Sequence, residues 1–237
     1  MASELTRQAR RIFTPLPPTY DRMASVLSLG QDPRWRRFLV SRVPSETTRV
    51  LDVATGTAAV AIELLRKNLR RTVVGLDQSE PMLRVGAARA AETGGGDRSV
   101  FVLAQGERPP FAPATFDALT FTYLLRYVDD PAAVLRGLVE LVKPGGTIAS
   151  LEFGVPSGLW RPAWWLYTRI VLPVAGLVAS RAWYEVGRFL GPSISAFYER
   201  HPLEAQLRMW RDAGVSPVSV RRLSLGGGVV IWGRRAA

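Results

Sequence analysis

The nine residues VLDVATGTA, Val50 to Ala58, decide the fold of this chain. Their apolar start predicts a buried strand over 49–54, and the small and apolar residues of 58–69 recur at helical spacing. Between them Thr55-Gly56-Thr57 predicts a tight turn, because glycine lets the backbone bend sharply and approach a ligand. Such a turn places a ligand at the carboxyl end of the strand, with Asp52 holding the turn and its amides.

The ligand of this turn is not expected to be a dinucleotide. Two of the three glycines of the G-x-G-x-x-G pattern are absent, so no pyrophosphate cradle is predicted. A ligand with an amino-acid tail and an adenosine head suits the turn better. An ordinary turn in another α/β domain is the alternative.

The same alternation continues along the chain. Strands are predicted over 72–77, 99–104, 116–122 and 147–153, helices over 80–91 and 130–142, and a sharp turn over 143–146. A helix over 201–213 and a hairpin of strands 218–223 and 228–232 follow. This order predicts an α/β, Rossmann-like fold with a doubly wound, mostly parallel sheet and a C-terminal antiparallel hairpin.

One domain of four parts is expected from the 237 residues. Residues 1–45 form a helical segment with breaks at Pro15, Pro17 and Pro18, and 46–153 form the ligand-binding core. Residues 154–200 are an apolar, Trp-rich insertion or lid, and 201–237 hold the last helix and the hairpin.

Composition excludes several kinds of site. The chain has no cysteine and one histidine, His201, so disulfides, thiolate chemistry and multi-histidine metal sites are excluded, and no metal site is predicted. His201 precedes Pro202 at a helix start and is interpreted as structural.

The formal charge of +11 has three interpretations: a genomic arginine bias, attraction to a membrane surface, or attraction to nucleic acid. Basic residues are scattered and no nucleic-acid-binding motif is present, so no nucleic-acid partner is expected. The apolar run 170–179 is too short to span a bilayer, and 1–11 lacks a signal-peptide pattern. We expect a cytoplasmic protein, or one attached peripherally at the inner face of the membrane; the oligomeric state is left open.

Three further positions fit the predicted ligand. Asp77 ends the second strand, 21 residues after Gly56, and could accept hydrogen bonds from both ribose hydroxyls; capping the next helix is the alternative. Gln105 and Gly106 follow the third strand and could read an adenine edge, or form a plain turn.

A reaction partner is expected beside the segment 122–127, after the fourth strand. Arg126 could bind an anionic oxygen or lower the pKa of a phenol there, and a surface salt bridge is the alternative. The insertion 159–179 places Trp160, Trp164 and Trp165 beside arginines. It fits a membrane interface, a lid over an apolar ligand, or a plain pair of core helices.

Over nearly its whole length the chain resembles the ubiquinone/menaquinone biosynthesis C-methyltransferases. The matching stretches are Tyr20-Asp21-Arg22-Met23, Leu27-Ser28-Leu29-Gly30, Trp35-Arg36, Val50-Leu51-Asp52-Val53-Ala54, Gly56-Thr57, Gly75-Leu76-Asp77, Pro81-Met82-Leu83, Pro110-Phe111, Thr115-Phe116-Asp117, Leu125-Arg126, 141–146, Leu151-Glu152-Phe153, Pro156, Leu172-Pro173 and Ser193-Ile194.

The resemblance implies a class I methyltransferase that uses S-adenosylmethionine and acts on a small apolar aromatic or prenylated acceptor, such as a demethylmenaquinone-like quinol. Arg126 and Tyr20 are the implied catalytic residues, near the acceptor. The residues expected around the cofactor are Asp52, Gly56, Thr57, Asp77, Met82, Gln105, Gly106 and Thr122.

The chain departs from the family pattern at several positions. Ala58 and Ala59 stand where the family usually has a glycine and an acid, Tyr127 stands for an asparagine, and Gly187 for a tyrosine. These changes leave three alternatives open: another small aromatic or lipid acceptor, a non-catalytic module on the same fold, and, from the charge alone, a nucleic-acid methyltransferase.

The expected mechanism is an in-line methyl transfer driven mainly by positioning. Arg126 would stabilise a developing oxyanion, and Tyr20 or water would relay the proton. No ordinary general base with a pKa near neutrality is evident in the sequence.

Overall fold

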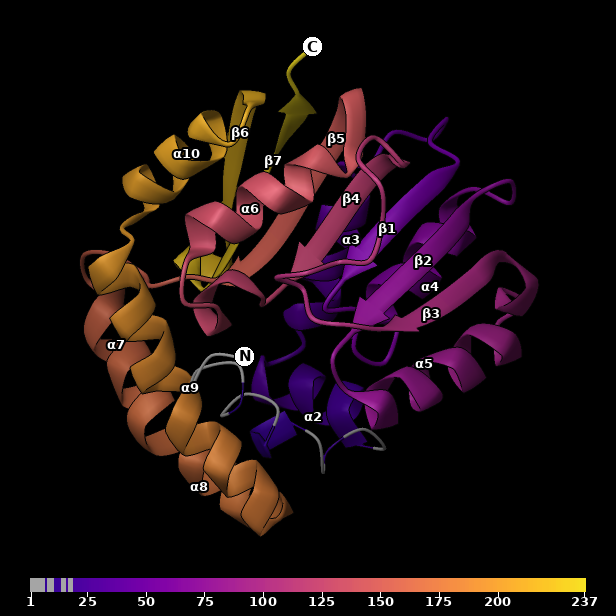
Figure 1. The fold of residues 1–237 in the computed structure, drawn as a ribbon. Coiled ribbons are helices and arrows are strands. Elements are labelled where there is room, and N and C mark those ends of the chain that lie inside the picture. Colours follow the sequence, from indigo (N-terminus) through magenta and orange to yellow (C-terminus); the bar gives the residue numbers. More distant parts are fainter. Residues whose placement is uncertain (1–6, 8–10, 14–15, 17–18) are drawn as a thin grey trace.

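The strand that ends in the glycine turn lies inside a mixed sheet in a computed structural model of the chain, which describes residues 7, 11–13, 16 and 19–237 (Figure 1). Within these residues the sheet has seven strands in the order β3-β2-β1-β4-β5-β7-β6. β7 runs antiparallel to both of its neighbours, β5 and β6, and the other neighbouring strands pair in parallel. The strands are β1 Arg49–Val53, β2 Thr72–Asp77, β3 Ser99–Leu103, β4 Phe116–Thr122, β5 Val142–Phe153, β6 Val215–Leu223 and β7 Gly228–Arg235.

Helices cover both faces of the sheet, as the predicted fold class requires (Figure 1). One core lies under α3 and α4, and the other under α6 and α10. The predicted breaks at Pro15, Pro17 and Pro18 lie outside the described residues. The helices are α2 Tyr20–Leu27, α3 Asp32–Val40, α4 Ala59–Lys67, α5 Glu80–Glu92, α6 Pro131–Glu140, α7 Trp160–Leu166, α8 Leu172–Ala179, α9 Arg181–Arg200 and α10 Leu203–Asp212.

The apolar run that predicted β1 is buried on both faces. Val50 packs in the core under α3 and α4, whereas Leu51 and Val53 pack in the core under α6 and α10. Side chains alternate along a strand, and a parallel strand between two helical layers is apolar on both sides. This explains why β1 reads as a continuous apolar run.

The expected sharp turn at 143–146 is wrong. β5 begins at Val142, and these residues form an irregularity inside the strand. The pairing with β4 shifts there, from Phe116 opposite Val142 to Ala118 opposite Thr147. The chain therefore bulges without leaving the sheet, a local feature that Pro-Gly-Gly also permits.

The insertion 154–200 folds as two adjacent helices beside the sheet (Figure 1). A π-helical stretch, Tyr167–Val171, joins α7 to α8, so that Trp160–Ala179 runs as one helix next to α9. This helix is long and apolar enough, by length and composition, to cross a membrane. The run 170–179 is therefore only the second half of a longer apolar helix, and the expectation that it is too short to span a bilayer is wrong for that helix.

Gly187 in α9 has a steric reason to differ from the family's tyrosine. A Cβ atom at Gly187 would lie 2.6 Å from the Leu172 carbonyl oxygen, because the α8 backbone passes directly over α9. At Gly191 a Cβ atom would lie 2.9 Å from the Thr168 Cβ atom. Two glycines thus let the helices of the insertion pack at backbone distance.

Gly187→Ala should therefore lower the stability of the protein. Overpacking of this kind costs roughly 1–3 kcal/mol, which for a chain of this size lowers the melting temperature by a few degrees. The matched control is Gly137→Ala in α6, where a Cβ atom meets nothing within 4 Å. That control should melt at or above the wild-type temperature, since alanine favours a helix. Equal melting of both variants would contradict the packing argument.

Candidate active site

Asp52 supports the glycine turn from behind. Its carboxylate accepts hydrogen bonds from the Thr55 and Thr120 hydroxyls, both at 2.7 Å. Burial raises the pKa of Asp52 to about 6, although the two hydroxyls favour its charged form. Asp52 is not among the residues that line the cleft described below. Its contacts hold the turn through side-chain hydroxyls rather than through the expected amides.

Asp77 faces the turn from the end of β2. One carboxylate oxygen accepts the Gly56 amide hydrogen at 2.9 Å, and the other accepts the Ser79 amide hydrogen at 2.9 Å. Helix α5 has Ser79 at its N-cap, so the alternative in which Asp77 caps this helix is wrong. Each carboxylate oxygen can accept more than one hydrogen bond, so both retain capacity for a ligand hydroxyl.

A cleft opens at the carboxyl ends of β1, β2 and β4, and holds about 1150 Å³ including its open mouth. This is the edge of an open α/β sheet where ligands bind. Eight of the ten predicted site residues line the cleft, whereas Asp52 and Gln105 do not. Glu107, which was not predicted, lines the cleft in place of Gln105. The eight are Tyr20, Gly56, Thr57, Asp77, Met82, Gly106, Thr122 and Arg126.

Arg126 lines the cleft from a short 3-10 helix, Leu125–Tyr127, and is buried. Its Nη2 donates to the Tyr127 hydroxyl at 2.6 Å, and its Nη1 lies 3.9 Å from the Glu152 carboxylate. The guanidinium is also 4.5 Å from the Tyr127 ring centre and 5.0 Å from that of Phe153. With its side chain 2% exposed, the alternative of a surface salt bridge is wrong.

Tyr20 brings an aromatic ring from α2 into the same cleft. Its ring stacks on Trp183 of α9 at 6.2 Å between centres and meets Phe13 edge-on. Burial raises the pKa of Tyr20 well above its usual value, although Arg36 acts in the opposite direction. The phenol therefore stays protonated near neutral pH, which suits a hydrogen-bond donor and not a base.

Asp21 is a residue that sequence reasoning missed. Its carboxylate accepts from the Thr57 hydroxyl at 2.6 Å and from Arg89, and Arg89 also donates to the Thr57 carbonyl oxygen at 2.7 Å. This link fastens α2 and α5 to the turn. Asp21 thus brings a carboxylate to the turn, where Ala59 stands in place of the family's acidic residue. The stretch Tyr20-Asp21-Arg22-Met23, which matches the family, was the sequence signal that could have identified Asp21.

Arg36 is a second missed residue, and it lines the cleft from α3. Its Nε donates to Asp32 at 2.7 Å, and Asp32 also accepts the Tyr123 hydroxyl at 2.6 Å. A buried guanidinium at the rim of a cleft can pair with a ligand carboxylate. Trp35-Arg36 is one of the stretches that match the family, but a sequence match does not show which way the Arg36 side chain points.

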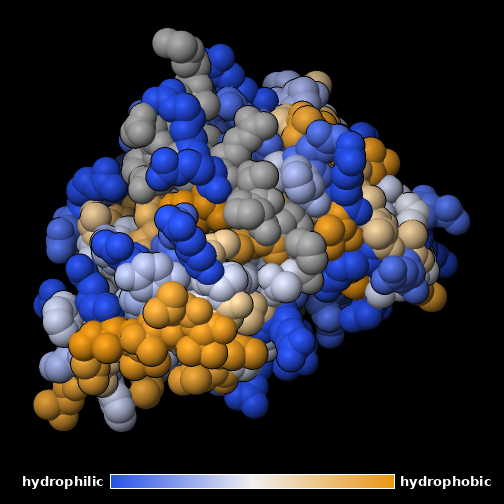
Figure 2. All heavy atoms as spheres, turned by 90° about the horizontal axis from the view of Figure 1, so that it is seen from below, coloured by the Kyte–Doolittle hydropathy of each residue, from blue (hydrophilic) through white to orange (hydrophobic). Residues whose placement is uncertain are grey.

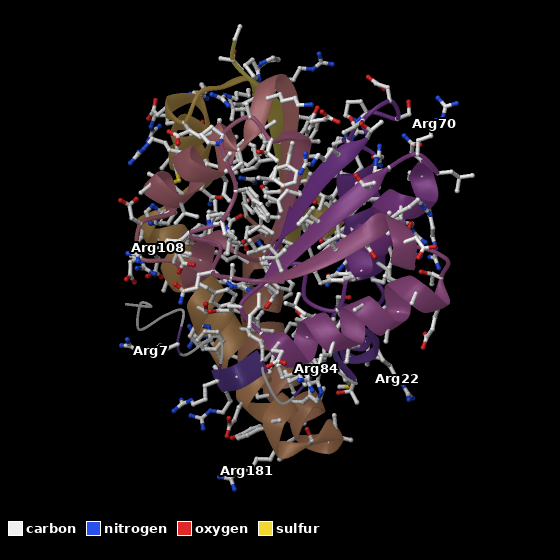
Figure 3. All side chains as sticks on the ribbon, turned by 45° about the vertical axis from the view of Figure 1, so that its right-hand side comes forward. Arg7, Arg22, Arg70, Arg84, Arg108 and Arg181 are labelled. Carbon is white, nitrogen blue, oxygen red and sulfur yellow. The ribbon has the colours of Figure 1, made fainter. Side chains whose placement is uncertain are left out.

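Outside the cleft we looked for metal ligands and for a basic surface among the described residues. Among the residues that the structure describes, no three His, Asp or Glu side chains cluster as metal ligands would. His201 ends α9 and packs against Phe197 with 5.3 Å between ring centres, outside the cleft lining. Figure 3 shows exposed arginines such as Arg22, Arg70 and Arg181 at widely separated places, not on one basic face.

The doubly wound sheet, its final antiparallel pair and the cleft at the glycine turn define a class I methyltransferase that uses S-adenosylmethionine. The family model described as the ubiE/COQ5 methyltransferase family matches residues 2–235, and the chain belongs to this family. The resemblance seen in the sequence is thereby confirmed, and the non-catalytic alternative is set aside.

Two curated relatives and one solved structure illustrate the likeness. The demethylmenaquinone methyltransferase of Clavibacter sepedonicus is 36% identical over 97% of this chain and 93% of its own. The ubiquinone/menaquinone biosynthesis C-methyltransferase UbiE of Desulfotalea psychrophila is 34% identical over 94% and 88%. A SAM-dependent methyltransferase from Thermotoga maritima matches with a TM-score of 0.63 at 18% identity, covering 95% of this chain and 99% of that one, which shows the fold.

Proposed function

We propose that this methyltransferase transfers a methyl group to a ring carbon of a prenylated quinol. Its relatives are named a ubiquinone/menaquinone biosynthesis C-methyltransferase and a demethylmenaquinone methyltransferase, which supports this class of acceptor. The observation that carries the proposal is a buried guanidinium, Arg126, at the end of an aromatic and apolar cleft. A quinol has an acidic hydroxyl that matches the cation and a ring and tail that match the apolar walls. Those walls are formed by Phe13, Tyr127, Val128, Trp183, Val186 and Leu190.

Residues around the glycine turn would hold the cofactor in this proposal. Asp77 would accept hydrogen bonds from the ribose hydroxyls, Met82 and Gly106 would contact the adenine, and Arg36 would pair with the methionyl carboxylate. The fit is supported by the open space beyond Gly56, where a Cβ atom would meet nothing within 4 Å. S-adenosylmethionine supplies an electrophilic methyl group when bound.

At the acceptor end, Arg126 would hold the quinol oxygen and stabilise its negative charge. Tyr20 would donate a hydrogen bond there, since burial keeps its phenol protonated. Positioning and charge stabilisation in a water-poor cleft account for much of such rate enhancements.

The acceptor class is tested with purified enzyme, methyl-labelled S-adenosylmethionine and two naphthoquinols, one prenylated and one without a tail. We expect a labelled ring-methyl product, with the tailed quinol used at least about 10-fold more efficiently because the tail buries apolar surface. An O-methylated product, or use of neither quinol, would contradict the proposal. Either result would favour another aromatic or lipid acceptor, which Tyr127 in place of the family's asparagine would then explain.

We also propose that the exposed face of Trp160–Ala179 docks on an anionic membrane, at the cytoplasmic face, where a prenylated acceptor dissolves. Figure 2 shows a continuous apolar area on the side where Figure 1 places α7 and α8. Leu159 and Val178 are 95% and 86% exposed, and Arg161, Arg169 and Arg181 are exposed beside them. Apolar side chains flanked by arginines suit the boundary of lipid head groups, and the net charge of +11 favours anionic lipid.

The double variant Leu177→Asp/Val178→Asp should lose binding to phosphatidylglycerol-containing vesicles by at least about 10-fold in a flotation assay, because two apolar contacts are replaced by charges. Its turnover of a tailless acceptor should be unchanged. Leu69→Asp, at a residue 79% exposed elsewhere, is the matched control and should bind like wild type. No vesicle binding by wild type, or a dimer closed through this face, would overturn the proposal.

A further inference from the structure

Glu152 is a buried carboxylate directly behind Arg126. It lies near the end of β5 and is 5% exposed, while Arg126 is 3% exposed. The 3.9 Å between Arg126 Nη1 and the nearer Glu152 oxygen is too long for a hydrogen bond. Among the described residues, the other Glu152 oxygen and the Arg126 Nε and Nη1 atoms have no hydrogen-bond partner.

A buried pair with this geometry is not optimised as a structural ion pair. Taking two charges out of water is costly unless close contact and further hydrogen bonds compensate. Buried polar atoms without partners are uncommon, and a catalytic role is one of the reasons for which they are kept. Arg126 reaches the cleft and Glu152 does not line it, so a ligand meets the arginine first.

The groups around Glu152 come from three elements. Arg126 and Tyr127 face it from the 3-10 helix, Tyr198 from α9, and Arg222 of β6 lies near Tyr198. Burial raises the pKa of Glu152 to about 7, although Arg126 and the Leu124 and Leu125 amides favour the carboxylate. The carboxyl can thus exchange a proton near neutral pH.

We propose that Glu152 takes up the proton that the acceptor loses, because Arg126 can pair with only one anion at a time in this buried site. When the acceptor oxyanion forms beside Arg126, it replaces the Glu152 carboxylate as the partner of the guanidinium, and Glu152 becomes a neutral acid. This inference rests on the proposed quinol acceptor. Glu152 is a positioning and proton-accepting residue that acts through Arg126.

The atoms and charges of the step balance. The acceptor O–H bond breaks, and its proton passes to Glu152 through a water molecule beside Arg126, the residue that joins the cleft to the buried carboxylate. The electron pair of the oxyanion drives a ring carbon to form a C–CH3 bond as the S–CH3 bond breaks. The ring C–H proton then returns to the acceptor oxygen and restores the aromatic ring, and the one proton left on Glu152 goes to solvent before the next turnover.

The pH profile of kcat/KM for the prenylated quinol separates this role from a structural one. Wild-type activity should rise with pH as the carboxyl ionises through about 7. Glu152→Gln should be about 100-fold slower at pH 8, the low end of what acid–base groups contribute, and should lose that rise. Its affinity for S-adenosylhomocysteine should be unchanged, and Glu152→Asp should restore part of the activity and the pH-dependent rise.

A measurement on wild type covers the case in which the variants fail to fold. Binding of an unreactive naphthol at pH 8 should produce the infrared band of a protonated carboxyl group, and 13C-labelling of glutamate should shift that band. A Glu152→Gln enzyme with wild-type rate and pH profile, or the absence of the band, would overturn the role of Glu152. Failure of wild type to methylate the quinol at all would instead overturn the proposed acceptor.

Discussion

Replacing Asp77 with alanine is expected to weaken S-adenosylmethionine binding by about 1000-fold, since two hydrogen bonds to a charged acceptor are worth roughly 1.5–3 kcal/mol each. The variant loses more than the ribose contacts. Asp77 also accepts the Gly56 and Ser79 amide hydrogens, at 2.9 Å each, so its removal loosens the turn beside the proposed cofactor site.

Calorimetric titration of S-adenosylmethionine and S-adenosylhomocysteine measures this effect. Asp77→Asn is the matched control: it keeps the shape and one acceptor oxygen but turns an amide group toward Gly56 or Ser79. It should bind with an affinity between those of wild type and Asp77→Ala. Thermal melting without ligand should show that both variants are folded. Binding by Asp77→Ala within threefold of wild type would remove Asp77 from the cofactor site.

Replacing Arg126 with alanine should lower kcat by about 1000-fold, the upper end of the effect of deleting one oxyanion-stabilising donor. Cofactor affinity should change less than threefold, because the proposed partner of Arg126 is the acceptor and not the cofactor. Equal losses of turnover and of cofactor affinity would contradict the assigned role.

Loss of stability has to be separated from loss of catalysis in this variant. Removing one partner of a buried pair leaves the other charge uncompensated, which typically costs about 3–5 kcal/mol. The double variant Arg126→Met/Glu152→Gln removes both charges and should recover the melting temperature without recovering turnover. Arg126→Lys keeps the charge but not the planar fork, and should retain only a small part of the activity.

The sheet could be predicted because its signals are local. β4 has the bounds that its alternating and apolar residues predict, and α5 begins at Glu80 as Pro81 near its start indicates. The bulge at 143–146 was missed because Pro-Gly-Gly is equally compatible with a turn and with a strand irregularity. Pairing with β4, a long-range interaction, decides between the two.

The site was predictable where a motif fixes the direction of a side chain. Asp77 and Thr122 end strands, so both face the cleft. Gln105 and Glu107 follow a strand through a loop, and which of them faces the cleft depends on how that loop packs. Asp52 points away because side chains alternate along β1 and its hydroxyl partners lie beneath the turn.

The residues that sequence reasoning missed act through partners far away in the chain. Asp21 meets Thr57 and Arg89, and Asp32 links Arg36 to Tyr123. Glu152 completes a pair with Arg126 across neighbouring strand ends. No local pattern encodes these contacts. They follow from the topology, which places α2 and the first turn of α3 at the carboxyl ends of the strands.

The most direct test of the account is a crystal structure of the enzyme with S-adenosylhomocysteine. We predict that both ribose hydroxyls lie within hydrogen-bond distance of the Asp77 carboxylate and that the sulfur atom faces the part of the cleft that Tyr20 and Arg126 line. A nucleoside bound away from Asp77, or a sulfur atom directed away from Arg126, would contradict the proposed site.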